Sequence, residues 1–205
     1  MQTSMLSMND PHALALAVEI LAGGGLVAFP TDNVYQLGAL AFNELAVSRI
    51  SELTGRSAEK PLAVLIGEAG QLERVAAEVN PAARQLASRF WPGLLTIVLA
   101  RHASIPEAVS PLATVGVRIP NFPETIELLK LCGPLAVNAA CVPGLSASTT
   151  ARGVQAQFEG RIALILDGGV TPGGMPSTVL DCTGPRPFIL REGPIRLWEI
   201  MKAVG

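Results

Sequence analysis

The sequence is poor in the residue types that define several common protein classes. It has three cysteines and two histidines among 205 residues. Neither a disulfide framework nor a zinc site is indicated by so few ligands, which lie far apart in the chain. Because unpaired cysteine is among the most buried residue types, we expect Cys132, Cys141 and Cys182 to be buried structural thiols.

Long apolar runs are also missing. The mean hydropathy is +0.42, but Pro, Gly or charge interrupts every apolar stretch before the roughly 18 residues that a membrane span requires. The N-terminus shows no basic segment followed by a short apolar core and a small-residue cleavage site. We therefore expect a soluble, cytoplasmic protein that does not associate with a membrane.

Charge is scarce as well, since charged residues make up 16% of the chain and the net charge is −2. This balance argues against a globally basic nucleic-acid-binding protein, although a local basic patch is compatible with it. The familiar catalytic signatures are also lacking. There is no P-loop, no G-x-G-x-x-G after a strand, no G-x-S-x-G and no H-E-x-x-H.

What the sequence does contain is an alternation of helical and strand patterns. Apolar spacing, caps and breakers predict helices over residues 11–21, 43–55, 69–79, 81–90, 123–131 and 194–204. Short apolar runs predict strands over residues 26–29, 62–66, 94–99, 114–119, 134–137, 162–166, 178–181 and 188–191. Such alternation is typical of α/β folds. Because no repeat or linker interrupts it, we expect a single domain over residues 1–205.

Polar segments interrupt the apolar strands, and loops rich in Gly and Pro (residues 141–148 and 168–176) follow two of them. Ligands of open α/β sheets bind at such strand ends. The first polar segment, residues 29–38, reads F-P-T-D-N-V-Y-Q-L-G. Taken alone, it could be only a turn, since Pro, Asp, Asn and Gly are turn formers.

This segment resembles the P-T-(D/E)-T-V-Y-G-L-G motif of the YrdC/Sua5 family of L-threonylcarbamoyladenylate synthases. Further motifs of that family match in order at residues 56–62, 90–96, 115–120, 166–169, 177–179 and 190–193. They correspond to K-x-R-x-x-x-K-P-L, F-W-P-G-x-L-T, V-G-V-R-x-P, L-D-G-G, S-T-V and L-R-x-G. The resemblance covers nearly the whole chain. It implies a YrdC-like domain, with a twisted mixed β-sheet, flanking helices and a concave basic ligand-binding face.

The resemblance also implies a reaction. ATP, bicarbonate and L-threonine would give threonylcarbamoyl-AMP and pyrophosphate, and partner proteins would pass the threonylcarbamoyl group to a tRNA adenosine. Magnesium would accompany ATP as part of the substrate, with no tightly bound metal or organic cofactor. This chemistry requires positioning and cations more than a nucleophile, because a carbamate oxygen must lie in line with the α-phosphorus.

The matched motifs carry over a set of binding residues. By resemblance, the ATP site would consist of Arg56, Lys60, Thr114 and Arg191, and the threonine site of Asn33, Arg118 and Ser177. Without the family, Arg56 and Lys60 would read as a solvated helix end. Arg118 points to function by itself, because it lies between apolar strand residues and unpaired charges are seldom buried.

Several motif positions depart from the family pattern, mostly by losing polar side chains. These positions are Asn33, Gln36, Thr54, Leu65, Ala139, Cys141 and Ala147. Three interpretations follow: a working synthase with an altered pocket, a paralogue with a different nucleotidyl or carbamoyl reaction, and a non-catalytic protein that binds RNA, including double-stranded RNA, or a nucleotide. A cysteine nucleophile at Cys141 is disfavoured, because no histidine lies in a matching motif.

Overall fold

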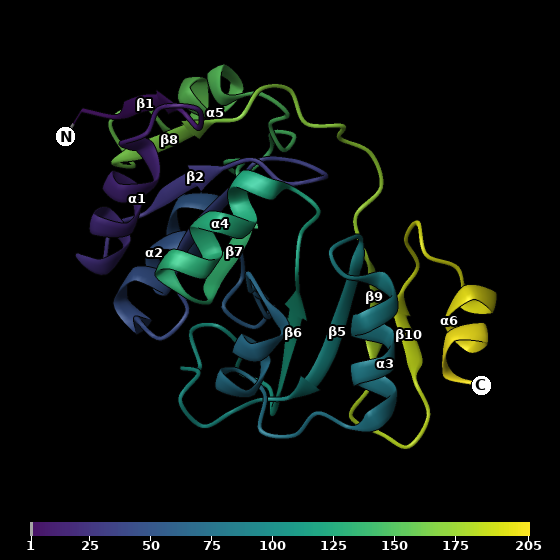
Figure 1. The fold of residues 1–205 in the computed structure, drawn as a ribbon. Helices are drawn as coiled ribbons and strands as arrows, with labels where there is room; N and C mark the ends of the chain where they lie inside the picture. The colour runs from purple at the N-terminus through teal and green to yellow at the C-terminus, as the bar shows by residue number, and fades with distance from the viewer. Residues whose placement is uncertain (1) are drawn as a thin grey trace.

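The computed structural model describes residues 2–205, and its backbone forms a ten-stranded mixed sheet with helices on both faces (Figure 1). The strands are β1 (Ser4–Ser7), β2 (Val27–Phe29), β3 (Gln36–Leu40), β4 (Ala63–Leu65), β5 (Leu95–Ala100), β6 (Thr114–Arg118), β7 (Leu135–Ala139), β8 (Leu164–Asp167), β9 (Thr178–Asp181) and β10 (Phe188–Arg191). Their order across the sheet is β1-β8-β2-β3-β7-β4-β6-β5-β9-β10. Parallel and antiparallel neighbours are interspersed, so the sheet is mixed.

The helices pack in two groups. They are α1 (Ala13–Ala22), α2 (Glu44–Thr54), the 3₁₀ helix η1 (Ala69–Arg74), α3 (Pro81–Phe90), α4 (Pro123–Cys132), α5 (Ala151–Phe158) and α6 (Leu197–Val204). Buried residues of α1 and α4 belong to one hydrophobic cluster, and those of α2, α3, α5 and α6 to another. Along β2, Val27 and Phe29 belong to the first cluster and Ala28 to the second. Because successive strand residues point to opposite faces, the two groups cover opposite faces of the sheet.

The capping residues explain where α2 begins and ends. The side chain of Asn43 accepts a hydrogen bond from the backbone N–H of Ala46 at 3.1 Å, which satisfies a free donor of the first turn. At the other end Gly55 has φ +61°, a left-handed conformation that glycine adopts without steric cost. Both features agree with the predicted helix over residues 43–55.

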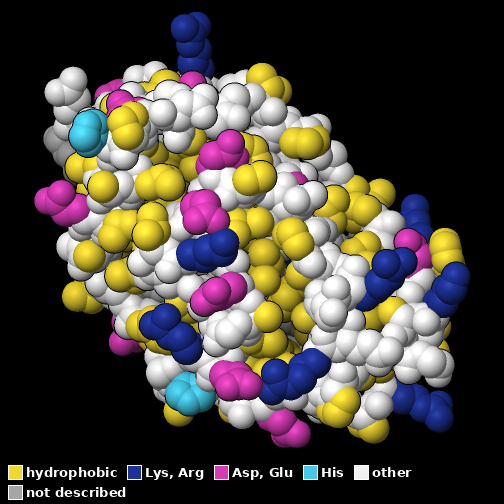
Figure 2. Space-filling view, in the orientation of Figure 1, with side chains coloured by type: hydrophobic (Ala, Val, Ile, Leu, Met, Phe, Trp, Pro, Cys, Tyr) yellow, Lys and Arg dark blue, Asp and Glu magenta, His cyan; other side chains and the backbone are white. Residues whose placement is uncertain are grey.

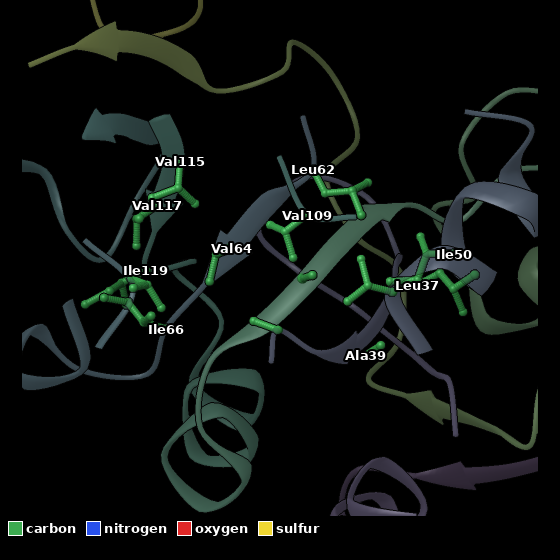
Figure 3. Packing of buried hydrophobic residues seen from close by; sticks show 14 of the residues in the cluster. Leu37, Ala39, Ile50, Leu62, Val64, Ile66, Val109, Val115, Val117 and Ile119 are labelled. Carbon is green, nitrogen blue, oxygen red and sulfur yellow. The ribbon is translucent and has the colours of Figure 1, made fainter. Parts of the chain in front are cut away.

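The larger core lies on the α2 and α3 side of the sheet. Figure 3 shows Val64 of β4 close to Val115 and Val117 of β6, and Leu37 of β3 close to Ile50 of α2. The intervening residues of β6 therefore point to the other face. Because alternate residues of β6 point away from this core, they form a second face of the sheet, which is partly open.

The structure confirms the α/β prediction and differs from it in detail. Residues 69–79 do not form a full helix, because only η1 forms and it ends at Arg74. Three elements were missed, namely β1, β3 and α5.

Of the three thiols expected to be buried, Cys182 is buried, whereas Cys132 and Cys141 are partly exposed; all three are free. None of the helices within residues 2–205 has the length and apolar character to cross a bilayer.

Candidate functional site

A cavity of about 650 Å³ lies on the open face of the sheet. Its floor and walls come from β3, β7, β4, β6, β5, β9 and β10, together with the segments that follow β2, α2, β5, β7 and β8. On β6 the lining residues are Thr114, Gly116 and Arg118, which alternate with the core residues Val115 and Val117. The strand pattern that builds the core thus also directs Thr114 and the motif positions Gly116 and Arg118 into the cavity.

Gly116 keeps the floor of this cavity open. A Cβ atom at this position would lie 3.1 Å from Cγ2 of Thr96 and 3.8 Å from Cγ2 of Val98. Both neighbours lie on β5, which pairs antiparallel with β6. A larger side chain at Gly116 would fill the space above the strands.

Arg118 is held rigidly at one end of the cavity. Its Nε donates to the carbonyl oxygen of Gly93 at 2.8 Å, and its Nη2 donates to Oδ1 of Asp32 in an ion pair. Burial lowers the pKa of Arg118, and the charge and hydrogen bond of Asp32 partly oppose this effect. Within residues 2–205, Nη1 makes no hydrogen bond, and no side-chain N or O atom is both buried and unpartnered. Nη1 therefore keeps some contact with solvent, and Arg118 lines the cavity.

Arg191 and Ser177 form a second polar group in the cavity. Nε and Nη2 of Arg191 donate to the carbonyl oxygen of Ser177 at 3.2 and 2.8 Å, and Nη2 also lies 3.3 Å from Ser177 Oγ. The Ser177 hydroxyl is 2.8 Å from Oγ1 of Thr96, and both residues are buried. The two hydroxyls and the guanidinium are thus connected by hydrogen bonds.

Arg56 also lines the cavity and is anchored to backbone and side-chain oxygens. Its Nη1 donates to Oδ1 of Asn138 at 3.0 Å, Nε donates to the carbonyl oxygen of Lys60 at 3.2 Å, and Nη2 donates to that of Pro61. Lys60 contributes its backbone here; its residue is exposed and does not line the cavity. The structure therefore brings Arg56 into the site but leaves the Lys60 side chain outside it.

The three guanidinium groups converge. The charge of Arg191 lowers the pKa of both Arg56 and Arg118, in addition to the larger effect of burial on each. Among residues 2–205 no Asp or Glu lines the cavity, and the only acid paired with the three arginines is Asp32. Such a cationic concavity attracts anions. Figure 2 shows Lys and Arg side chains at the right-hand edge, over α6 and β10, and most acidic side chains elsewhere.

The positions that depart from the family pattern do not all lie in the cavity. Its lining includes Gln36, Leu65, Ala139 and Ala147. In contrast, Thr54 is buried in α2, where its hydroxyl donates to the carbonyl oxygen of Ile50 at 2.7 Å. Neither Thr54 nor Cys141 lines the cavity.

The remaining expected site residues also line the cavity. They are Asn33 and Thr114, so all the expected residues except Lys60 line one cavity. Sequence reasoning missed Asp32 and Thr96 as members of the site. Both lie inside matched motifs, which was the available signal, but their partners Arg118 and Ser177 are more than 80 residues away in the chain.

Comparison with known proteins links this site to a family. Residues 19–193 match the Sua5/YciO/YrdC family model, which is described as "Telomere recombination". The chain is 42% identical over 194 residues to the threonylcarbamoyl-AMP synthase of Pyrococcus abyssi, covering 94% of this chain and 57% of that protein. It is 41% identical over 209 residues to the Bacillus subtilis enzyme of the same name, covering 99% of this chain and 59% of that protein.

A solved structure agrees with these relatives. The crystal structure of P. abyssi Sua5 complexed with L-threonine superposes with a TM-score of 0.88 at 42% identity, over 94% of this chain and 57% of that one. This chain therefore spans somewhat more than half the length of these relatives.

Proposed function

Because the chain belongs to the Sua5/YciO/YrdC family, we propose that it is a threonylcarbamoyl-AMP synthase that acts on ATP, bicarbonate and L-threonine. The observation that carries this proposal is the convergence of Arg56, Arg118 and Arg191 in a cavity whose described lining has no acidic residue. A triphosphate and an amino-acid carboxylate are the anions that such a set of guanidinium groups fits.

In the proposed reaction the threonine amine and bicarbonate condense to a carbamate with loss of water. A carbamate oxygen then attacks the α-phosphorus of ATP, the bond from this phosphorus to the pyrophosphate oxygen breaks, and pyrophosphate leaves. The arginines would neutralise the charge that collects on the phosphate oxygens. Their hydrogen bonds to protein oxygens hold them in place before the substrates bind, which avoids reorganisation during the reaction.

The two ends of the cavity suit the two substrates. We assign the threonine carboxylate to Nη1 of Arg118, beside Ser177 and Asn33. We assign the triphosphate to Arg191 and Arg56, with Thr114 near the nucleotide. Lys60 reaches the phosphates only if its exposed side chain turns inward. Among the proposed ATP-binding residues, we therefore expect Lys60 to contribute least to binding.

Magnesium fits this site as a companion of the nucleotide. No group of three or more His, Cys, Asp or Glu residues that could hold a metal occurs in the described chain, and the lining offers hydroxyls and amides. Mg²⁺ is commonly bound through substrate phosphates in such sites, where it supplies charge neutralisation. Beyond the synthase itself, we propose that its product passes to partner proteins that modify a tRNA adenosine in the cytoplasm.

Pyrophosphate release tests this function. The pure protein is incubated with ATP, magnesium and bicarbonate, with and without L-threonine, alongside the variants R118M and R49M. Arg49 is exposed on α2 and does not line the cavity, so R49M is a matched control. Threonine-dependent release in the wild type and R49M, with loss in R118M, supports the proposal. Absence of threonine dependence in the wild type refutes it.

One observation favours a second candidate, a non-catalytic relative that binds a nucleotide or RNA. Leu65, Ala139 and Ala147 line the cavity with apolar side chains where the family pattern has polar ones. Each lost charge-assisted contact costs about 1.5–3 kcal/mol of binding. Melting temperatures distinguish the candidates: a rise with double-stranded RNA and none with ATP would favour the binding protein.

A further inference from the structure

One chain segment crosses the open face of the sheet. Residues 168–176, here called the strap, connect β8 to β9. Six strands lie between β8 and β9 in the sheet, so the strap must span most of its width. Figure 1 shows it as the long yellow-green segment that runs over the top of the sheet and down to β9. Its residues Gly174 and Pro176 line the cavity, and Ser177 follows directly.

Hydrogen bonds hold the first half of the strap at Gly168, Gly169 and Thr171. The hydroxyl of Tyr35 donates to the carbonyl oxygen of Gly169 at 2.8 Å, and the backbone N–H of Thr171 donates to that of Thr149 at 2.9 Å. Val170 is 78% exposed, whereas Thr171 is only 3% exposed, so hydrogen bonds fix this half more than apolar side chains do. Segments with few buried contacts open at low free-energy cost, and their individual hydrogen bonds decide how often they do.

Asn33 holds the second half, which forms the wall of the cavity. The backbone N–H of Gly173 donates to the carbonyl oxygen of Asn33 at 2.7 Å. The side-chain Nδ2 of Asn33 donates to the carbonyl oxygen of Met175 at 2.8 Å. Asn33 is 7% exposed, whereas Met175 is 51% exposed. A buried residue of the β2–β3 connection thus fastens an exposed segment at two adjoining points.

The side-chain contact depends on asparagine. The family motif has threonine at this position, and threonine has no atom at the place of Nδ2. Gly173 and Gly174 have φ values of +67° and +91°, a region that other residues rarely adopt. These glycines let the strap turn so that the carbonyl of Met175 faces Asn33. The hydrogen bond is therefore a feature of this chain's own sequence.

We propose that Asn33 is a positioning residue, whose amide fastens the strap over the cavity and thereby places the Ser177 hydroxyl against Thr96 and Arg191. Met175 is two residues from Ser177, so fixing its carbonyl limits the movement of the hydroxyl. The part of this inference that concerns threonine rests on the proposed function. The part that concerns the strap does not.

Hydrogen exchange of the backbone amides, measured without substrates, tests the strap directly. The variants are N33A, which removes the amide, and N33D, which keeps the shape but replaces the donor by an oxygen. The control V170S alters an exposed side chain of the strap that makes no hydrogen bond in the described chain. Loss of one neutral hydrogen bond corresponds to roughly a three- to tenfold change in opening.

We therefore expect the Gly173 amide to exchange about three- to tenfold faster in N33A and N33D and unchanged in V170S. The Thr178 amide, which donates to the carbonyl oxygen of Leu94 just before β5, should keep its wild-type rate in all three. Wild-type exchange at Gly173 in either folded variant overturns the proposal, as does equal acceleration at Gly173 and Thr178. If N33A does not fold, the exchange rate of the Gly173 amide in N33D tests the proposal.

Steady-state kinetics then test the link to Ser177. N33A, which adds no charge beside the threonine carboxylate, should raise KM for threonine more than it lowers kcat, because a misplaced hydroxyl weakens binding before chemistry. Faster strap exchange with an unchanged KM would overturn the role in placing Ser177. An enzyme inactive with threonine would refute the proposed function, while the exchange experiment would still settle whether Asn33 fastens the strap.

Discussion

The ion pair between Arg118 and Asp32 should stabilise the fold as well as prepare the site. Their side chains are only 9% and 13% exposed. Removing one partner of a buried pair leaves the other charge uncompensated and costs about 3–5 kcal/mol. Because both side chains keep some contact with solvent, we expect R118M to lose about 3 kcal/mol. For a chain of this length that corresponds to a fall in Tm of roughly 6–12 °C.

A double-mutant cycle isolates this interaction. D32N removes the charge of Asp32 but keeps an oxygen that can accept from Arg118, so its cost should be smaller than that of R118M. The double variant leaves neither charge unpaired, and its loss should be smaller than the sum of the single losses by roughly 1–3 kcal/mol. Urea unfolding followed by circular dichroism, with m-values compared, measures all three.

The exposed pair of Lys130 and Glu127 on α4 provides the control cycle. Its Nζ to Oε1 distance is 2.7 Å, but both side chains are about half exposed. Solvent screens such a pair, so K130M and E127Q should show no measurable coupling. Additive losses for Arg118 and Asp32, within about 0.5 kcal/mol, would refute the argument that their burial makes the pair strong.

Three further predictions concern the cavity and its frame. G116V should abolish any rise in Tm caused by pyrophosphate while the variant remains folded, because the added side chain fills the space above Thr96; an undiminished rise would place the anion elsewhere. G193A should lose about 1–3 kcal/mol in urea unfolding, since its Cβ would lie 2.3 Å from the backbone N of Thr178. Burial, with the nearby Asp167, raises the pKa of Tyr35 to about 12. The neutral phenol therefore stabilises the fold fully below pH 10, and this contribution is lost between pH 10 and 12. The stability difference between wild type and Y35F should fall over that range, and a constant difference would contradict the assignment.

Local signals predicted the elements whose ends are marked in the sequence. The helix α2 is the clearest case, because Asn43 caps it and Gly55 ends it. The strand β3 was missed because its polar start was interpreted as a turn. The strand β1 has only four residues and pairs with β8, about 160 residues away. It is therefore stabilised by a distant segment, and its local sequence does not predict it. The helix α5 carries a glycine in its first turn, which weakens the pattern.

The candidate site was predictable to a different extent. All the predicted site residues except Lys60 line the cavity, and β-strand alternation sends Thr114, Gly116 and Arg118 to one face, but these residues are a minority of the lining. The sequence could not reveal which partners these side chains would have. The contact of Arg118 with Asp32 and the exposure of Lys60 both depend on how distant segments meet.

The hydrogen bonds of the three arginines indicate which end of the cavity is ready for an anion. In the described chain Nη1 of Arg118 and Nη1 of Arg191 make no hydrogen bond, so each can meet a ligand without losing a protein contact. All three nitrogens of Arg56 already donate to protein oxygens, among them Oδ1 of Asn138. A ligand must share or replace those contacts, which reduces the net gain from Arg56. An anion should therefore bind first between Arg118 and Arg191, and Arg56 should add affinity only for ligands long enough to reach it.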